Sequence, residues 1–83
     1  MRELLRAIRG EIEQERACAV ATVLDTSGSA PRTAGAKMLV RQDGSTCGTV
    51  GGGQVEAEVI RVAGAALATG RSFELRYNLR GGL

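Results

Sequence analysis

The sequence contains no histidine and no tryptophan, and its 83 residues include only two cysteines, one proline, one tyrosine and one phenylalanine. Without histidine, the chain lacks the commonest general base and the commonest metal ligand of proteins. A Ser–His–Asp or Cys–His catalytic arrangement is therefore excluded. Glu56 and Glu58 are two residues apart in an expected helix, so they would face different ways and could not act as an acid–base pair. These residues favour a binding or accessory protein over an enzyme, and they predict no metal site.

Charge and hydropathy argue against two further classes. Eleven basic and nine acidic residues leave a net charge of +2, with no basic stripe, so we expect no nucleic-acid partner. The longest apolar run falls short of the ~20 residues that span a bilayer. The first fifteen residues, MRELLRAIRGEIEQE, have no apolar segment typical of a signal peptide. The sequence therefore predicts a soluble, cytoplasmic protein that does not bind membranes.

The two cysteines and the small size bear on stability. Cys18 and Cys47 match no zinc-binding spacing, and in a reducing compartment we expect free thiols that serve as small hydrophobic side chains. Residues 1–83 suffice for a single domain, with no second Rossmann-like domain. A chain this short has a thin core, so a partner that covers one face would help, and we expect a homo-oligomer or a second subunit.

Periodicity predicts an α+β fold, a small single-layer sheet with helices packed on it. The expected order is α-β-β-β-α-β, at residues 2–15, 17–25, 36–42, 45–50, 54–69 and 71–79. The dipeptide Asp43-Gly44 between two extended segments favours a type I′ hairpin turn. Gly70 is placed to end the second helix.

Two of these elements carry more specific expectations. Apolar residues at helical spacing predict one buried stripe in the first helix; they are Leu4, Leu5, Ile8 and Ile12. The segment ACAVATVLD, residues 17–25, is largely apolar on both faces, which is typical of a central strand covered on both sides. The small alanines on one of its faces suggest that a helix approaches closely there.

A run of three glycines, Gly51, Gly52 and Gly53, joins an expected strand to an expected helix in the segment GSTCGTVGGGQVE. Fixing three glycines is entropically costly, so the run needs a reason. One reason is an oxyanion site, because a helix N-terminus offers free N–H groups and Thr49 could add a hydroxyl. The other is a simple cap, in which the Glu56 carboxylate folds back onto the N–H of Gly53 and competes with any bound anion.

A second candidate element is the loop TSGSAPRTAG, residues 26–35. Its length is typical of functional loops. Arg32 is a fork-shaped donor suited to phosphate or carboxylate, and Ser29 adds a hydroxyl. The alternative is an ordinary connection with a solvated arginine.

Taken together, these two segments resemble the N-terminal domain of the xanthine dehydrogenase accessory proteins, the XdhC/CoxI family. That family has a G-S-x-P-R-x-x-G-A-x-M segment, a D-G turn and a G-T/S-V/I-G/S-G-G-x-x-E segment. Here they correspond to residues 28–38, 43–44 and 48–56. Typical members continue into a Rossmann-like domain, and some have a cysteine where this chain has Gln54. Two motifs in the right order make the resemblance specific.

The resemblance implies a chaperone-like role in the maturation of molybdenum hydroxylases such as xanthine or carbon monoxide dehydrogenase. The implied cargo is the molybdenum cofactor, bound transiently for sulfuration or insertion. The implied partners are the apoenzyme and a separate Rossmann-like subunit. The residues that would face the cofactor are Ser29, Arg32, Thr49, Gly51, Gly52, Gly53 and Glu56. The alternative is a structural or dimerisation module whose glycine turn binds no ligand.

Overall fold

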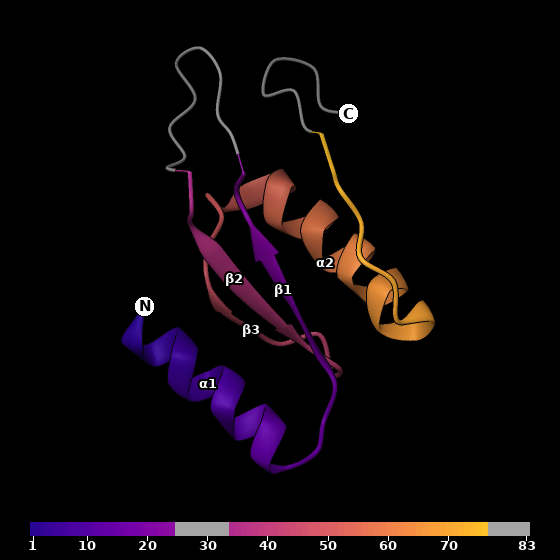
Figure 1. Ribbon diagram of the computed structural model, residues 1–83. Helices are drawn as coiled ribbons and strands as arrows, with labels where there is room; N and C mark the ends of the chain where they lie inside the picture. Colours follow the sequence, from indigo (N-terminus) through magenta and orange to yellow (C-terminus); the bar gives the residue numbers. More distant parts are fainter. Residues whose placement is uncertain (25–33, 77–83) are drawn as a thin grey trace.

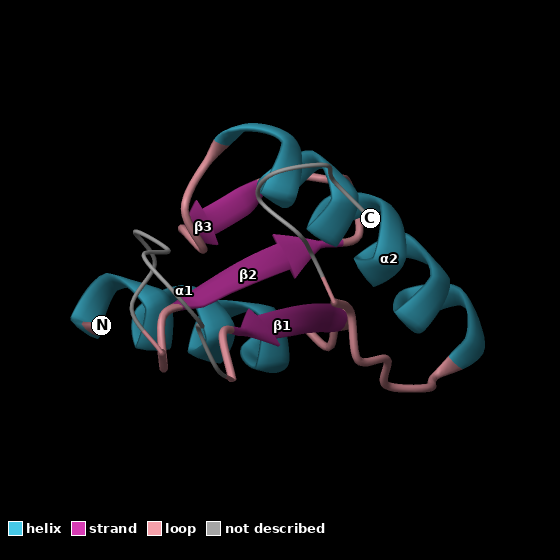
Figure 2. Ribbon diagram, turned by 90° about the horizontal axis from the view of Figure 1, so that it is seen from above, coloured by secondary structure: helices cyan, strands magenta, loops and turns pink. Residues whose placement is uncertain are grey.

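The computed structural model describes residues 1–24 and 34–76. Its elements in that part of the chain are α1 (Arg2–Glu13), β1 (Cys18–Thr22), β2 (Lys37–Arg41), β3 (Thr46–Gly48) and α2 (Gly53–Thr69). The strands form an antiparallel sheet in the order β1-β2-β3. The sheet lies between the two helices (Figures 1 and 2). The predicted α+β class and the first five elements are confirmed.

The main core lies between α2 and one face of the sheet. Met38 and Val40 of β2 are buried there with Val50 and with Ala63 of α2. The side chains that pack against this cluster are Ala19, Ala21, Val23, Val55, Val59 and Ile60. The alanine face of β1 therefore meets a helix, as the sequence predicts, because small side chains let α2 approach the strand.

The opposite face of the sheet is covered by α1, which contacts β2 and β3. Leu39 is fully buried, and Leu4 is only 5% exposed. The predicted single buried stripe of α1 is wrong, because Leu5 is 58% exposed and Ile12 is 66% exposed. Leu4 shares its face with the buried Glu11, two helical turns further on, so the face that meets the sheet differs from the face that carries Leu5 and Ile12.

The prediction that the first strand is central is also wrong. Among the described residues, β1 is an edge strand that pairs only with β2, and the central strand is β2. Val20, opposite Leu39 in the register, is exposed. An apolar pattern on both faces indicates how much of a strand is covered on average, but it carries no information on the order of strands in the sheet.

The hairpin between β2 and β3 is confirmed, but its predicted type I′ turn is wrong. A type I′ turn needs positive φ at both central residues, whereas only Gly44 of the Asp43-Gly44 pair has positive φ, +86°. The loop is longer: the Gly44 N–H donates to the Arg41 carbonyl, and the Arg41 N–H donates to the Ser45 carbonyl. Asp43 decides this geometry, since its carboxylate accepts from both the N–H and the hydroxyl of Ser45.

The second helix ends where the sequence predicts. Gly70 adopts the left-handed conformation, with φ +71°, and its N–H donates to the Ala66 carbonyl. The predicted strand over 71–79 is not formed by residues 71–76, and residues 77–79 lie outside the described part of the chain. Throughout residues 1–24 and 34–76, no helix is long and apolar enough to cross a membrane.

Candidate functional site

One end of the sheet brings together the two segments that the sequence singles out. β1 leads into the candidate loop and β2 leads out of it, and two backbone bonds close its base: Val23 N–H to Ala36 O, 2.9 Å, and Gly35 N–H to Val23 O, 2.7 Å. In β3, Gly48 pairs with Met38 at the start of β2, so the glycine turn leaves the sheet at the same end. Figure 1 shows α2 beginning at this end, opposite the β2–β3 hairpin.

The predicted site residues divide into two groups. Ser29 and Arg32 lie outside the described residues. The others form one compact turn between β3 and α2: Thr49, Gly51, Gly52, Gly53 and Glu56. The fold therefore brings the three glycines together with Thr49 and Glu56, and it places this turn beside the base of the loop that carries the other two.

The backbone explains the three glycines. Gly51, Gly52 and Gly53 have φ values of +127°, +82° and +61°. Residues with a Cβ rarely adopt such values, so the turn requires glycine at each position whether or not it binds a ligand. The N-cap of α2 is Gly52 rather than the predicted Gly53. A Cβ at either of these two residues would meet no atom within 4 Å, so the constraint there is conformational and not steric.

The Glu56 carboxylate accepts hydrogen bonds from three donors of the turn. Its Oε2 accepts from the N–H of Gly52 at 2.8 Å, from the N–H of Val50 at 3.1 Å and from the Thr49 hydroxyl. The Thr49 hydroxyl in turn accepts from the N–H of Gly51 at 3.0 Å. The carboxylate therefore occupies the position that an external oxyanion would take, and the turn is satisfied by its own chain, which agrees with the alternative left open by the sequence.

These contacts stabilise the ionised form of Glu56. The hydrogen bond from the Thr49 hydroxyl lowers the pKa of this carboxyl most. Burial is the next largest effect and raises the pKa, and the N–H groups of Gly52, Val50 and Gly51 each lower it by less, so the net shift is downward. The negative charge also lies in the first turn of α2, where the helix dipole favours it. At neutral pH an external anion would therefore meet a charged competitor.

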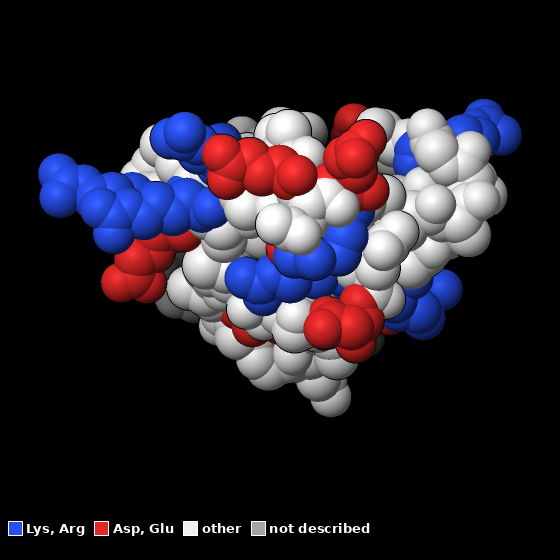
Figure 3. All heavy atoms as spheres, turned by 90° about the horizontal axis from the view of Figure 1, so that it is seen from below, with Lys and Arg blue, Asp and Glu red and all other residues white. Residues whose placement is uncertain are grey.

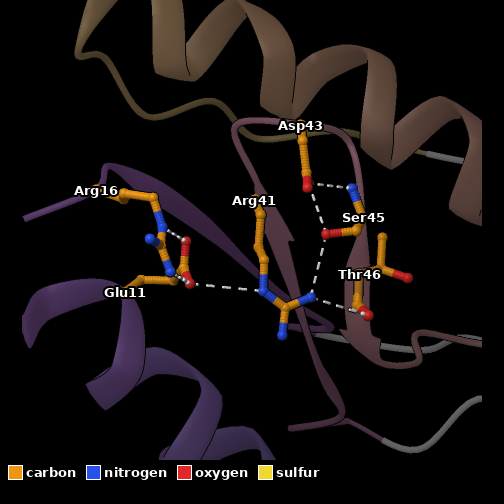
Figure 4. A network of polar contacts seen from close by, with 6 residues as sticks. All are labelled: Glu11, Arg16, Arg41, Asp43, Ser45 and Thr46. Carbon is orange, nitrogen blue, oxygen red and sulfur yellow. Dashed lines mark hydrogen bonds and ion pairs between the residues drawn. The ribbon is translucent and has the colours of Figure 1, made fainter. Parts of the chain in front are cut away.

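A second cluster, at the hairpin end, was not predicted. The buried Glu11 accepts two bonds from Arg16, at 3.1 and 3.0 Å, and its Oε2 lies 3.7 Å from Nε of Arg41 (Figure 4). Arg41 also donates to the Ser45 hydroxyl and the Thr46 carbonyl. The cluster fastens the end of α1 to the hairpin. No local signal could have found it, because the Glu11–Arg16 spacing does not pair on a helix and Arg41 is distant in sequence.

Replacing Glu11 with glutamine is expected to remove part of the acid sensitivity of the fold. The Arg16 hydrogen bond lowers the pKa of Glu11 most; burial opposes it, and the charges of Arg16 and Arg41 lower the pKa further, so the net shift is downward. A lowered pKa contributes stability that is present above the ordinary value of 4.5 and is lost as the pH falls through the lowered value. The urea midpoint should therefore fall more between about pH 6 and pH 3 in the parent than in Glu11→Gln. If the urea midpoint fell equally in both proteins, Glu11 would not be a source of the acid sensitivity.

In the described part of the chain we searched for two other kinds of site, a metal centre and a strongly charged surface. Within 1–24 and 34–76, no group of three or more His, Cys, Asp or Glu could hold a metal ion. Cys18 and Cys47 are free, half-buried thiols, as expected. On the face seen from below, acidic and basic side chains are interspersed (Figure 3). The glycine turn therefore remains the candidate site.

This geometry defines a class of protein: a small α+β module with a glycine turn at the start of a helix. Residues 11–78 match the profile of the XdhC and CoxI family, and the chain belongs to that family. Over 76 residues it is 37% identical to the molybdenum cofactor insertion chaperone PaoD of Escherichia coli (strain K12), a match that covers 92% of this chain and 24% of PaoD. Over 55 residues it is 51% identical to the uncharacterized protein YqeB of the same organism, 66% of this chain and 10% of YqeB. The chain thus spans a quarter or less of either relative. No solved structure matches it significantly.

Proposed function

We propose that this chain is a cofactor-handling module of molybdenum hydroxylase maturation, which acts in the cytoplasm and holds the molybdenum cofactor as cargo for delivery to an apoenzyme. Membership of the XdhC and CoxI family supports this role, as does the similarity to a protein named as a molybdenum cofactor insertion chaperone. The proposed role is binding and transfer, without catalysis by side chains of this chain.

The observation that carries the proposal is the meeting of two segments at one end of the sheet. The hydrogen bonds between Val23 and Ala36 and between Gly35 and Val23 fix the base of the loop that contains Arg32. The Met38–Gly48 pairing fixes the exit of the glycine turn next to it. A guanidinium from the loop and N–H groups from the turn are the donors that a phosphate group on a pterin would need.

The turn has donors of the type that a phosphate needs, but they are already occupied. The N–H groups of Val50, Gly51 and Gly52 are oxyanion donors, but the Glu56 carboxylate and the Thr49 hydroxyl now accept them. Cargo binding at this turn therefore requires Glu56 to move away. The protein's part is to exchange an internal carboxylate for an external anion, with Arg32 adding positive charge.

The proposal is tested by titrating the purified chain with isolated molybdenum cofactor and with a phosphate-bearing pterin, followed by pterin fluorescence. Arg32→Ala should weaken binding by about tenfold, the loss of a charge-assisted hydrogen bond, and Arg32→Ala with Gly52→Val should weaken it further. Gly52→Val forces a Cβ onto φ +82°, so circular dichroism must first show that the double variant folds. The single variant tests the site without that risk.

A matched control carries the same types of change at the far side of the molecule. Arg71→Ala with Gly64→Ala alters an exposed arginine after α2 and a glycine inside α2 whose Cβ would meet open space. This control should bind like the parent. Equal affinity of the parent, Arg32→Ala and the control would show that the assigned site is wrong, even if the chain binds the cofactor elsewhere.

A second candidate is an interaction module whose glycine turn binds no ligand. The self-satisfied hydrogen bonds of Glu56 favour it, since they account for the glycines without cargo. If the folded parent and all its folded variants bind neither the cofactor nor the pterin, the first proposal fails and the interaction module remains.

A further inference from the structure

The side of α1 that does not meet the sheet carries an apolar stripe. Leu5 and Ile12 are 58% and 66% exposed, Met1 is exposed as well, and Ile8 between them is half-buried. Their positions, 1, 5, 8 and 12, follow the 4-3-4 spacing with which one helix packs along another. A small chain rarely exposes such a row without a partner.

We propose that this stripe is the contact surface for a second copy of the chain, with the two α1 helices packed antiparallel about a twofold axis. The stripe is self-complementary in that arrangement. Met1 then lies opposite Ile12 of the second copy, and Leu5 lies opposite Ile8, so each residue finds an apolar counterpart at the same level. A symmetric contact of this kind closes on itself and gives a dimer.

The distribution of charge along the N-terminal segment selects the antiparallel arrangement. Its first ten residues carry three arginines and one glutamate, which are Arg2, Arg6, Arg9 and Glu3. In the next six, Glu11 is buried and pairs with Arg16, which leaves the charges of Glu13 and Glu15. Glu13 also pairs with Arg9 of its own helix at 3.3 Å, an exposed contact of the kind that contributes little energy. An antiparallel pair sets the basic half of each copy against the acidic half of the other, whereas a parallel pair would set like against like. Arg2 and the exposed Glu13 of the second copy come closest in this register.

The size of the contact predicts a weak dimer. α1 has twelve residues, about 18 Å of helix. Two helices of that length bury less than the ~800 Å² per partner of a standard stable interface. We therefore expect association that depends on concentration, and none of the stripe residues belongs to the proposed cofactor site.

Sedimentation velocity of the full 83-residue chain across a wide concentration range tests the proposal. The parent should show a monomer–dimer equilibrium. Leu5→Glu should weaken the dimer by tenfold or more, because it places a charge in the apolar stripe twice per dimer. Leu5 is mostly exposed, so the fold should survive, which circular dichroism checks. Phe73→Glu, at a residue 52% exposed outside α1, is the matched control and should leave association unchanged.

The antiparallel arrangement is tested by exchanging charges. Arg2→Glu and Glu13→Arg should each weaken self-association, since each sets like charges opposite one another. Mixing the two variants should restore the dimer as a mixed pair, because the two introduced side chains, of opposite charge, face each other at one contact and the native pair forms at the other. A parent that stays monomeric at every concentration would overturn the proposal. Three other results would also overturn it: Leu5→Glu leaves the dimer intact, Phe73→Glu disrupts the dimer, or the mixture of the two charge variants fails to restore it.

Discussion

Gly48→Ala is expected to lower the free energy of unfolding by about 3 kcal/mol, which is a large share of the stability of a typical small domain. Two effects combine at this residue. Its φ is +85°, and a Cβ there would lie 2.6 Å from the carbonyl oxygen of Lys37 in the neighbouring strand. That oxygen belongs to the backbone of β2 and cannot swing aside. Urea denaturation followed by circular dichroism at neutral pH measures the loss.

Substitutions at two other glycines separate the cost of the positive φ from the cost of the close contact. Gly70 has a positive φ of +71° in the left-handed helical region but open space around its Cβ position, so Gly70→Ala should cost only the conformational part, about 1–2 kcal/mol. Gly64 lies inside α2 with open space and an ordinary helical conformation, so Gly64→Ala should stabilise by about 0.5–1 kcal/mol. If Gly48→Ala cost no more than Gly70→Ala, the close contact with Lys37 would be refuted.

Glu56→Ala is expected to have opposite effects on stability and on anion binding. Removing the carboxylate leaves the N–H groups of Gly52 and Val50 without their acceptor, which should lower the free energy of unfolding by about 1–2 kcal/mol. The same change frees these donors and removes a competing charge, so a phosphate-bearing pterin should bind about tenfold more tightly. Urea denaturation and pterin titration of the same preparations measure both effects.

The pH dependence and a conservative variant serve as controls for Glu56. Because the pKa of Glu56 is lowered, its contribution to stability is present at neutral pH and is lost as the pH falls through the lowered value. Glu56→Gln keeps one acceptor oxygen without the charge, so it should fall between the parent and Glu56→Ala in stability. Weaker pterin binding by a folded Glu56→Ala would mean that Glu56 assists the anion instead of competing with it.

Features encoded by neighbouring residues could be predicted from the sequence. The helical period of α2 and its end at Gly70 follow from local spacing and from the ease with which glycine adopts positive φ. The β2–β3 hairpin follows from Asp43-Gly44, although the Asp43 side chain selects a longer turn than the dipeptide suggests. In the candidate site, the join between strand and helix and the folding back of Glu56 are local in the same sense.

Features that depend on distant parts of the chain could not be predicted. The edge position of β1 follows from sheet order, which the apolar pattern of a strand does not contain. The exposure of Leu5 and Ile12 depends on which face of α1 meets the sheet, and that face carries the buried Leu4 and the buried Glu11, which contacts the distant Arg41. The closeness of Gly48 to Lys37 likewise arises only once β2 and β3 pair.

The backbone of the glycine turn has a consequence in terms of chirality. From Gly51 to Gly53 the chain follows φ values of the sign that D-amino acids prefer. Every other genetically encoded residue is of the L form, so any missense change in these three codons introduces a side chain of the wrong hand for the local backbone. The turn therefore restricts the variation open to this segment through its handedness alone, before any demand made by a ligand.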